Sequence, residues 1–180
     1  RLQVEYLSDI TPCRNVIAWG RDHKKAQKYK ADMEKVGFKV QLVDTPRELA
    51  KKCNLIITAT ASSEALLFKN DIQPGTHITA MGSDVIGKRE LGPGLVSFAD
   101  LVIVDSISQC QERGEISFAL ADEEISIDQI IELGEVCSGS HPGRVSKKQI
   151  TITDLTGVAV QDIQIATAVF ESYMEKKNEI

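Results

Sequence analysis

The feature of this sequence that most constrains its fold is a series of short, mostly apolar runs. They lie at NVIAWG (15–20), FKVQLV (38–43), LIITAT (55–60), THITAMG (76–82), DLVIVDS (100–106) and QITITDLTG (149–157). Runs of Val, Ile and Leu of this length are typical of strands covered on both faces, as in parallel sheets flanked by helices. Helical or irregular segments separate the runs. The sequence therefore predicts an α/β fold in which six strands form a doubly wound, mostly parallel sheet.

Helix signals lie between these runs. Residues 2–10 carry apolar side chains at helical spacing and stop before a proline, so the chain is expected to begin inside a helix. Asp22 is placed to cap a helix that continues to about residue 36, and Gly37 ends it where left-handed backbone is favoured. Thr45, followed by Pro46, is expected to start a short helix. The segment after the last strand predicts a long final helix.

Charge and cysteine spacing exclude several classes of protein. The net charge of -5 argues against nucleic acid as a partner, because phosphate binding requires a concentrated basic surface. The four cysteines, at positions 13, 53, 110 and 137, form no C-x-x-C pair, and the three histidines are scattered, so no metal site is expected. No apolar run approaches the ~20 residues that span a bilayer. We expect a cytoplasmic protein with reduced thiols and no membrane partner.

Polar residues follow the predicted strands at their carboxyl ends, where open α/β sheets bind ligands. Arg21 and Asp22 come after the first strand, where a dinucleotide-binding fold contacts the adenosine ribose. A carboxylate there accepts from both ribose hydroxyls, whereas an arginine favours a 2′-phosphate, so Gly20 followed by Arg21 favours NADP over NAD. The alternative is that Asp22 only caps its helix and Arg21 is only a surface charge. The small residues around Thr60 suit either close approach of a ligand or tight packing.

Asp84 is the candidate catalytic residue. Gly82 allows the backbone to approach a ring, and the carboxylate two positions later is placed to exchange a proton with an amine or imine. Lys88 is placed to meet a phosphate or a carboxylate, or to face solvent. Because loop aspartates are often structural, these residues alone leave both interpretations of Asp84 open. A dinucleotide fold also needs a first strand and a G-x-G-x-x-G/A turn, and this chain starts within the helix that follows such a turn.

Six segments in this order, RLQVEYL, AWGRD, ITATAS, MGSDVIGKREL, VDS and DLTGVAVQD, resemble the ornithine cyclodeaminase and mu-crystallin family. The resemblance covers nearly the whole chain, and it is specific because of the order and spacing of motifs that are individually weak. It implies a Rossmann-like domain that binds NAD or NADP, truncated here before its first strand and glycine-rich turn. It also implies a homodimer that acts on a small amino acid or cyclic imine.

The resemblance assigns roles to individual residues. Asp84 looks like the family's acid/base aspartate, and Thr156 looks like the side chain nearest the reaction. The cofactor contacts expected from the resemblance and from the strand ends are Arg21, Asp22, Thr60, Met81, Gly82, Ser83, Lys88 and Leu155. Some family members carry serine where Leu155 stands here.

The same resemblance suggests how the chain is organised. Residues 1–156 are expected to form the incomplete NAD(P)-binding domain. Residues 157–180 are expected to form a helix that returns to a substrate and dimerisation domain outside this chain. The implied activity is deaminating cyclisation of ornithine to proline, amino-acid dehydrogenation or ketimine reduction. The nicotinamide would exchange hydride and Asp84 would handle the proton. The alternative is a non-catalytic NADPH-binding protein of the mu-crystallin kind.

Overall fold

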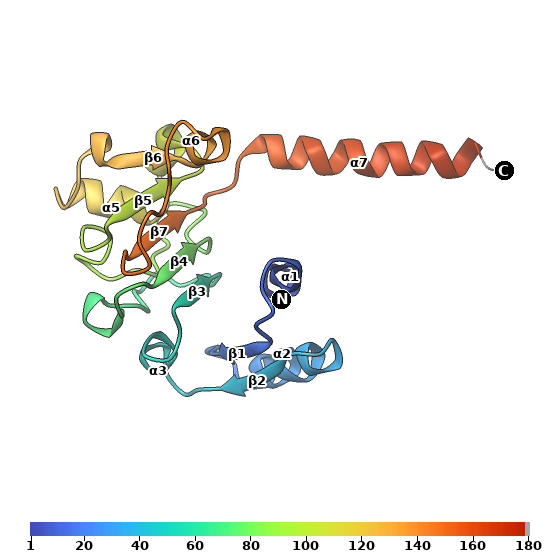
Figure 1. The fold of residues 1–180 in the computed structure, drawn as a ribbon, viewed down its shortest axis with the longest axis horizontal. Coiled ribbons are helices and arrows are strands. Elements are labelled where there is room, and N and C mark those ends of the chain that lie inside the picture. Colours follow the sequence, from blue (N-terminus) through green and yellow to red (C-terminus); the bar gives the residue numbers. More distant parts are fainter. Residues whose placement is uncertain (179–180) are drawn as a thin grey trace.

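The computed structural model describes residues 1–178, which contain seven strands in parallel pairs. A two-stranded sheet consists of β1 (Asn15–Ala18) and β2 (Lys39–Leu42). A five-stranded sheet has the order β3 (Leu55–Thr58), β4 (His77–Ala80), β7 (Thr151–Asp154), β5 (Leu101–Val104) and β6 (Ile130–Glu132). Figure 1 shows the two sheets with a space between β1 and β3. The prediction of a parallel α/β fold is confirmed.

The last strand of the sequence lies at the centre of the larger sheet. Thr153 of β7 is in register with Thr79 of β4 on one side and with Ile103 of β5 on the other. All four residues of β7 are buried, which agrees with a strand covered on both faces. Because every strand is parallel to its partners, the carboxyl ends of the strands in each sheet lie along one edge of it. The residues that follow the strands therefore become neighbours.

The prediction of six strands is wrong by one, because β6 was not expected. This strand has only three residues, Ile-Ile-Glu, and a 3-10 turn directly precedes it, so no apolar run marks it. The other strands are shorter than predicted. Each predicted run extended beyond its strand at one or both ends, most often into residues that form the loop after the strand.

The helices are α1 (Leu2–Tyr6), α2 (His23–Lys35), α3 (Pro46–Ala50), α4 (Ile107–Cys110), α5 (Glu115–Ala121), α6 (Leu133–Ser138) and α7 (Ala159–Asn178). Both predicted caps are confirmed: the Lys25 amide donates to Asp22, and the Glu48 amide donates to Thr45. Gly37, which follows α2, has the expected positive φ of 92°. The sequence did not predict α4, α5 or α6.

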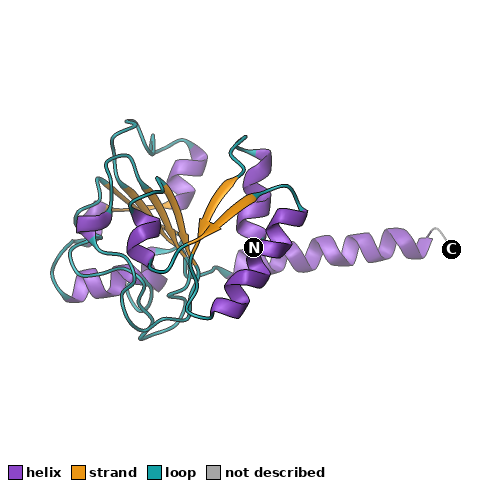
Figure 2. Cartoon of the chain, turned by 90° about the horizontal axis from the view of Figure 1, so that it is seen from below, coloured by secondary structure: helices purple, strands orange, loops and turns teal. Residues whose placement is uncertain are grey.

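Helices flank the strands (Figure 2), and two apolar cores result. The larger core contains Ile78 and Ile152 from the sheet, with Ala50, Cys110 and Ile116 from three helices packed against it. The smaller core is centred on Met33, Phe38 and Val40 and joins α2 to the two-stranded sheet. The two-stranded sheet is thus held mainly by its own helix.

Helix α7 extends away from the rest of the protein (Figure 1). Apolar side chains along it, including Ile163, Phe170 and Tyr173, are exposed. Neither α7 nor any other helix within residues 1–178 combines the length and apolar character needed to cross a membrane.

Candidate functional site

A cavity of about 600 Å³ lies between β1 and β3. Its walls include residues 18–22 at the end of β1, residues 56–61 at the end of β3, and parts of α1 and α2. Within residues 1–178, no strand pairs with the facing edges of β1 and β3. Three of the predicted site residues, Arg21, Asp22 and Thr60, line this cavity. Its volume is in the range of small-molecule and cofactor pockets.

Arg21 and Asp22 make contacts of their own in this structure. The Arg21 guanidinium donates to the hydroxyl of Ser62 at 3.2 Å, which links the ends of β1 and β3. Asp22 accepts the amide of Lys25 at 3.1 Å as the cap of α2. Both side chains belong to exposed residues, so neither contact closes the cavity. The helix-cap interpretation of Asp22 is correct, and the carboxylate still lies where the cavity wall begins.

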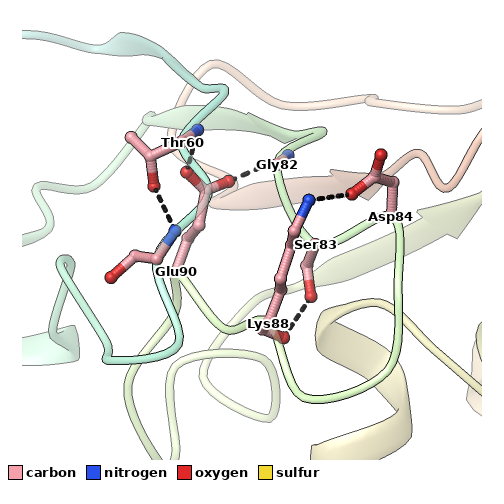
Figure 3. A network of polar contacts seen from close by, with 7 residues as sticks. Thr60, Gly82, Ser83, Asp84, Lys88 and Glu90 are labelled. Atoms are coloured by element: carbon pink, nitrogen blue, oxygen red, sulfur yellow. Dashed lines mark hydrogen bonds and ion pairs between the residues drawn. The ribbon is translucent and has the colours of Figure 1, made fainter.

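The loops after β3 and β4 are joined by a buried carboxylate that the sequence did not predict. Glu90 accepts the amide of Thr60 at 2.7 Å and the amide of Gly82 at 3.0 Å (Figure 3). A Cβ on Gly82 would overlap the carbonyl oxygen of Thr60 and would lie 2.5 Å from the Glu90 carboxylate. Only glycine therefore allows these two loops to approach each other so closely. Nothing in the KREL segment distinguishes Glu90 from its solvated neighbours at the level of sequence.

Glu115, the first residue of α5, holds Glu90 in turn. Its two carboxylate oxygens accept the amides of Glu90 and Leu91 at 2.7 and 2.9 Å. Burial away from water raises the pKa of Glu115 to about 7, and the amide hydrogen bonds oppose that rise. The loops after β3 and β4 are thus bound by the Glu90 carboxylate, and the backbone of Glu90 is bound by the Glu115 carboxylate.

Asp84 lies beyond this junction and is paired with Lys88. The ammonium contacts the carboxylate at 2.6 Å, and the Asp84 side chain is 52% exposed (Figure 3). The hydrogen bond from Lys88 lowers the pKa of Asp84, so this carboxylate is ionised at neutral pH. Ser83 donates its hydroxyl to the carbonyl oxygen of Lys88 and so closes the turn that carries the pair. Neither Asp84 nor Lys88 lines the cavity between β1 and β3.

The residues after β7 lie directly beside those after β4. The Leu155 amide donates to the carbonyl oxygen of Ala80 at 2.8 Å, and Met81 follows Ala80 in the chain. The buried Thr156 hydroxyl donates to Asp105 at 3.2 Å and receives a hydrogen bond from Gln109 at 3.0 Å. No role was predicted for Asp105 or Gln109, although Asp105 lies near the end of the predicted run 100–106. These two hydrogen bonds hold the Thr156 hydroxyl in one position between Asp105 and Gln109.

Asp154, the last residue of β7, is fully buried beneath this edge. One of its oxygens accepts the amide of Ile116 at 3.0 Å, and the other has no hydrogen-bond partner among the residues that the structure describes. Burial raises its pKa to about 8, and the nearby carboxylate of Glu115 adds to the rise. The nearby thiol of Cys110 has a pKa raised to about 12 by burial and by Asp154 and Asp105.

The predicted site residues therefore fall into three groups along the carboxyl ends of the strands. Arg21, Asp22 and Thr60 line the cavity; Met81, Gly82 and Ser83 follow the next strand; and Leu155 and Thr156 follow β7 beside them. Asp84 and Lys88 form an exposed pair in the turn after Ser83. The cavity that residues 18–22 and 56–61 line at the strand ends has the volume and the position of a dinucleotide pocket.

The parallel sheet with its ligand-sized cavity at the strand ends defines a Rossmann-like α/β domain. Residues 1–177 match the model of the ornithine cyclodeaminase/mu-crystallin family, so the chain belongs to that family. A relative described as an uncharacterized cyclodeaminase of Sinorhizobium fredii is 35% identical over 178 residues, which are 98% of this chain and 54% of the relative.

Two solved structures resemble the chain closely. An archaeal alanine dehydrogenase dimer with bound NAD has a TM-score of 0.91 and 31% sequence identity over 97% of this chain and 54% of that one. The iminosuccinate reductase of Paracoccus denitrificans in complex with NAD+ has a TM-score of 0.88 and 34% sequence identity, over 97% of this chain and 53% of that one. This chain thus spans about half the length of the relatives that it matches.

Proposed function

We propose that this chain is the cofactor-binding part of an NAD(P)-dependent enzyme that converts an amino acid or the corresponding imine. The observation that carries the proposal is a cavity of about 600 Å³ lined by the residues that end β1 and β3, with the loops after β4 and β7 next to that of β3 along the same edge of the sheet. Both solved structures described above have NAD in their names, and relatives are named as dehydrogenases and reductases. Cyclodeamination of ornithine, amino-acid dehydrogenation and ketimine reduction are all compatible with such a site.

The cofactor contacts of this proposal are the residues predicted at the strand ends. Arg21 and Asp22, at the end of β1, would hold the adenosine ribose, with the exposed Arg21 guanidinium favouring NADP. Thr60 would contact the cofactor from the cavity wall. Met81, Gly82, Ser83, Lys88 and Leu155 would contact it from the loops after β4 and β7. When bound, the cofactor would supply or accept a hydride at the alpha carbon.

Asp84 would act on the proton. Its carboxylate is ionised, as a group that accepts a proton from a substrate ammonium or activates water at an imine carbon must be. The Lys88 ion pair lowers its pKa and so weakens it as a base, which means that catalysis requires the substrate or cofactor to draw Lys88 away from Asp84. Thr156 would lie beside the substrate, with its hydroxyl fixed by Asp105 and Gln109.

We further propose that residues 1–156 need a preceding segment to complete the domain. A parallel strand between β1 and β3 would satisfy both free edges and would fill the part of the cavity that residues 18 and 56–58 line. The part lined by residues 19–22 and 59–61, at the ends of the strands, would remain for the cofactor, and a glycine-rich turn after the added strand would reach it. Residues 157–180 would carry α7 to a substrate and dimerisation domain in a homodimer. Deuterium exchange tests this arrangement: the amides of β1 and β3 that face each other across the gap, and not those bonded to β2 and β4, should be protected in the longer protein and exchange fast in residues 1–180 alone.

The activity is tested in the full-length protein with NADH, NADPH, their oxidised forms, amino acids and cyclic imines. Asp84→Asn should lower turnover by about 10²-fold or more while cofactor binding persists. Asp122→Asn, an exposed aspartate after α5, serves as the matched control and should leave turnover unchanged. Near-normal turnover by Asp84→Asn would contradict the catalytic role. Tight NADPH binding with no turnover of any substrate would instead favour the non-catalytic, mu-crystallin-like alternative.

A pH profile isolates the contribution of Lys88. Because Lys88 lowers the pKa of Asp84, Lys88→Met should raise that pKa and move the acidic limb of kcat/KM to higher pH. An unchanged acidic limb would show that a different group controls the profile.

Arg21→Ala should weaken NADPH binding more than NADH binding, because an arginine at this position favours a 2′-phosphate. Equal losses of affinity for the two cofactors would contradict the 2′-phosphate assignment.

A further inference from the structure

Three backbone segments from different parts of the chain meet at Glu90. Its carboxylate oxygens accept the amides of Thr60 and Gly82, which follow β3 and β4 (Figure 3). Its own carbonyl oxygen accepts the amides of Leu66 and Leu67 at 2.7 and 3.1 Å. Since the residue has 0% exposure, water does not compete for these bonds. This side chain therefore bridges the two strand-end loops beyond the last backbone hydrogen bond between them, in which the Met81 amide donates to the Thr58 carbonyl oxygen at 3.0 Å.

A second carboxylate prevents Glu90 from moving. From the start of α5, the side chain of Glu115 accepts hydrogen bonds from the amides of Glu90 and Leu91. Glu115 is 2% exposed. The chain of contacts thus leads from α5 through Glu115 to the backbone of Glu90, and from the Glu90 carboxylate to the loops. A shift of α5 or a loss of either carboxylate would be transmitted to Thr60 and Gly82.

We propose that Glu90 is a positioning residue for the dinucleotide, which it serves by fixing the distance between the loops that carry Thr60 and Gly82. The proposal rests on the proposed function, because these two loops are the expected cofactor contacts. By binding both amides, Glu90 also withdraws two N–H donors from the ligand. The cofactor would then contact the side chains and the other backbone groups of these two loops, whose relative positions Glu90 and Glu115 help to fix.

The choice of glutamate for this role has a chemical reason. An ionised carboxylate offers two acceptor oxygens and so can receive two amides at once. Glutamine offers one oxygen, and its amide NH2 would face an N–H group. Aspartate keeps the charge but is one methylene shorter, so it cannot reach both amides without a shift of the backbone. Both variants should therefore break the bridge, glutamine because it lacks a second acceptor oxygen and aspartate because it is too short.

The test uses the full-length protein and measures the Kd of NADPH and NADH by fluorescence, well below the melting temperature. Both Glu90→Gln and Glu90→Asp are expected to raise the Kd about tenfold, the size of a lost charge-assisted hydrogen bond. Asp100→Asn is the matched control: this carboxylate accepts the amide of Ile150 at 2.7 Å near the amino ends of β5 and β7. Its Kd should not change, even if its melting temperature falls.

Hydrogen exchange supplies a second readout that a general loss of stability would not produce. Exchange in the Glu90 variants should increase selectively in residues 59–63 and 81–84. If the Glu90 variants do not fold, Glu115→Gln should give a smaller rise of Kd in the same direction. An unchanged Kd in these variants, or a normal Kd in Glu90→Asp alone, would overturn the proposal for Glu90. The proposed function would still stand in that case, provided that the wild-type protein binds the dinucleotide. A wild-type protein that binds no dinucleotide would overturn both.

Discussion

Replacement of Asp154 by asparagine should change the pH dependence of stability in a defined direction. In the folded protein, burial raises the pKa of this carboxyl from its ordinary value of 3.8 to about 8, which is a shift of about four units. Each unit corresponds to ~1.4 kcal/mol, so ionised Asp154 costs the folded state about 5 kcal/mol at alkaline pH. The oxygen without a partner is the structural origin of this cost.

The sign follows from proton binding. Between pH 4 and pH 8 the folded state binds a proton at Asp154 that the unfolded chain has released. The stability contributed by this group is therefore complete below the unfolded pKa and is lost as the pH rises through the folded one. The asparagine side chain of the variant does not titrate, so the variant's stability should lack this slope. From pH 5 to pH 8, the stability difference should move by about 4 kcal/mol in favour of Asp154→Asn.

Urea unfolding at half-unit steps between pH 5 and pH 8 measures this difference. Glu115, with its pKa raised to about 7, adds a second slope to both proteins, and because its carboxylate also raises the pKa of Asp154, the comparison is repeated in a Glu115→Gln background. Asp128→Asn, an exposed aspartate in the turn before β6, is the control and should follow the wild type. A stability difference between Asp154→Asn and the wild type that stays constant with pH would refute this reasoning.

Two further outcomes depend on local packing. Gly82→Ala should destabilise the protein by about 1 to 3 kcal/mol, because its Cβ would overlap the carbonyl oxygen of Thr60. Gly134→Ala in α6, where no described atom lies within 4 Å of the added Cβ, should be neutral or stabilising, and equal losses in urea unfolding would contradict the steric argument. In a thiol-labelling time course at pH 8, exposed Cys137 should react quickly, whereas Cys110, with its pKa raised to about 12, should react only when the protein opens. Fast labelling of Cys110 would show that its pocket opens readily.

The sequence predicted the fold because local signals and the global fold agree. The apolar runs gave six of the seven strands, and the caps at Asp22 and Thr45 appear as expected. The missed strand β6 and the short helices α4 to α6 are too brief to show a period. Their positions depend on packing against residues far away in the sequence.

The candidate site was predictable only in part. Residues at or shortly after the end of an apolar run, such as Arg21, Thr60 and Asp84, could be found because strand ends are recognisable. Glu90 and Glu115 could not, because a buried carboxylate in a charged segment looks like a solvated one. Their role depends on which distant amides they face, and that is fixed only by the folded backbone.

The central position of β7 has a consequence for folding. His77 at the start of β4 and Thr151 of β7 are 74 positions apart, yet they are neighbours in the sheet. During synthesis, β3, β4, β5 and β6 all emerge from the ribosome before the strand that joins β4 to β5. Until then, the edges of β4 and β5 are free to pair with other chains, and closure requires contacts of high sequence separation. We expect slow folding and a period of aggregation risk that ends only when residue 154 has joined the sheet.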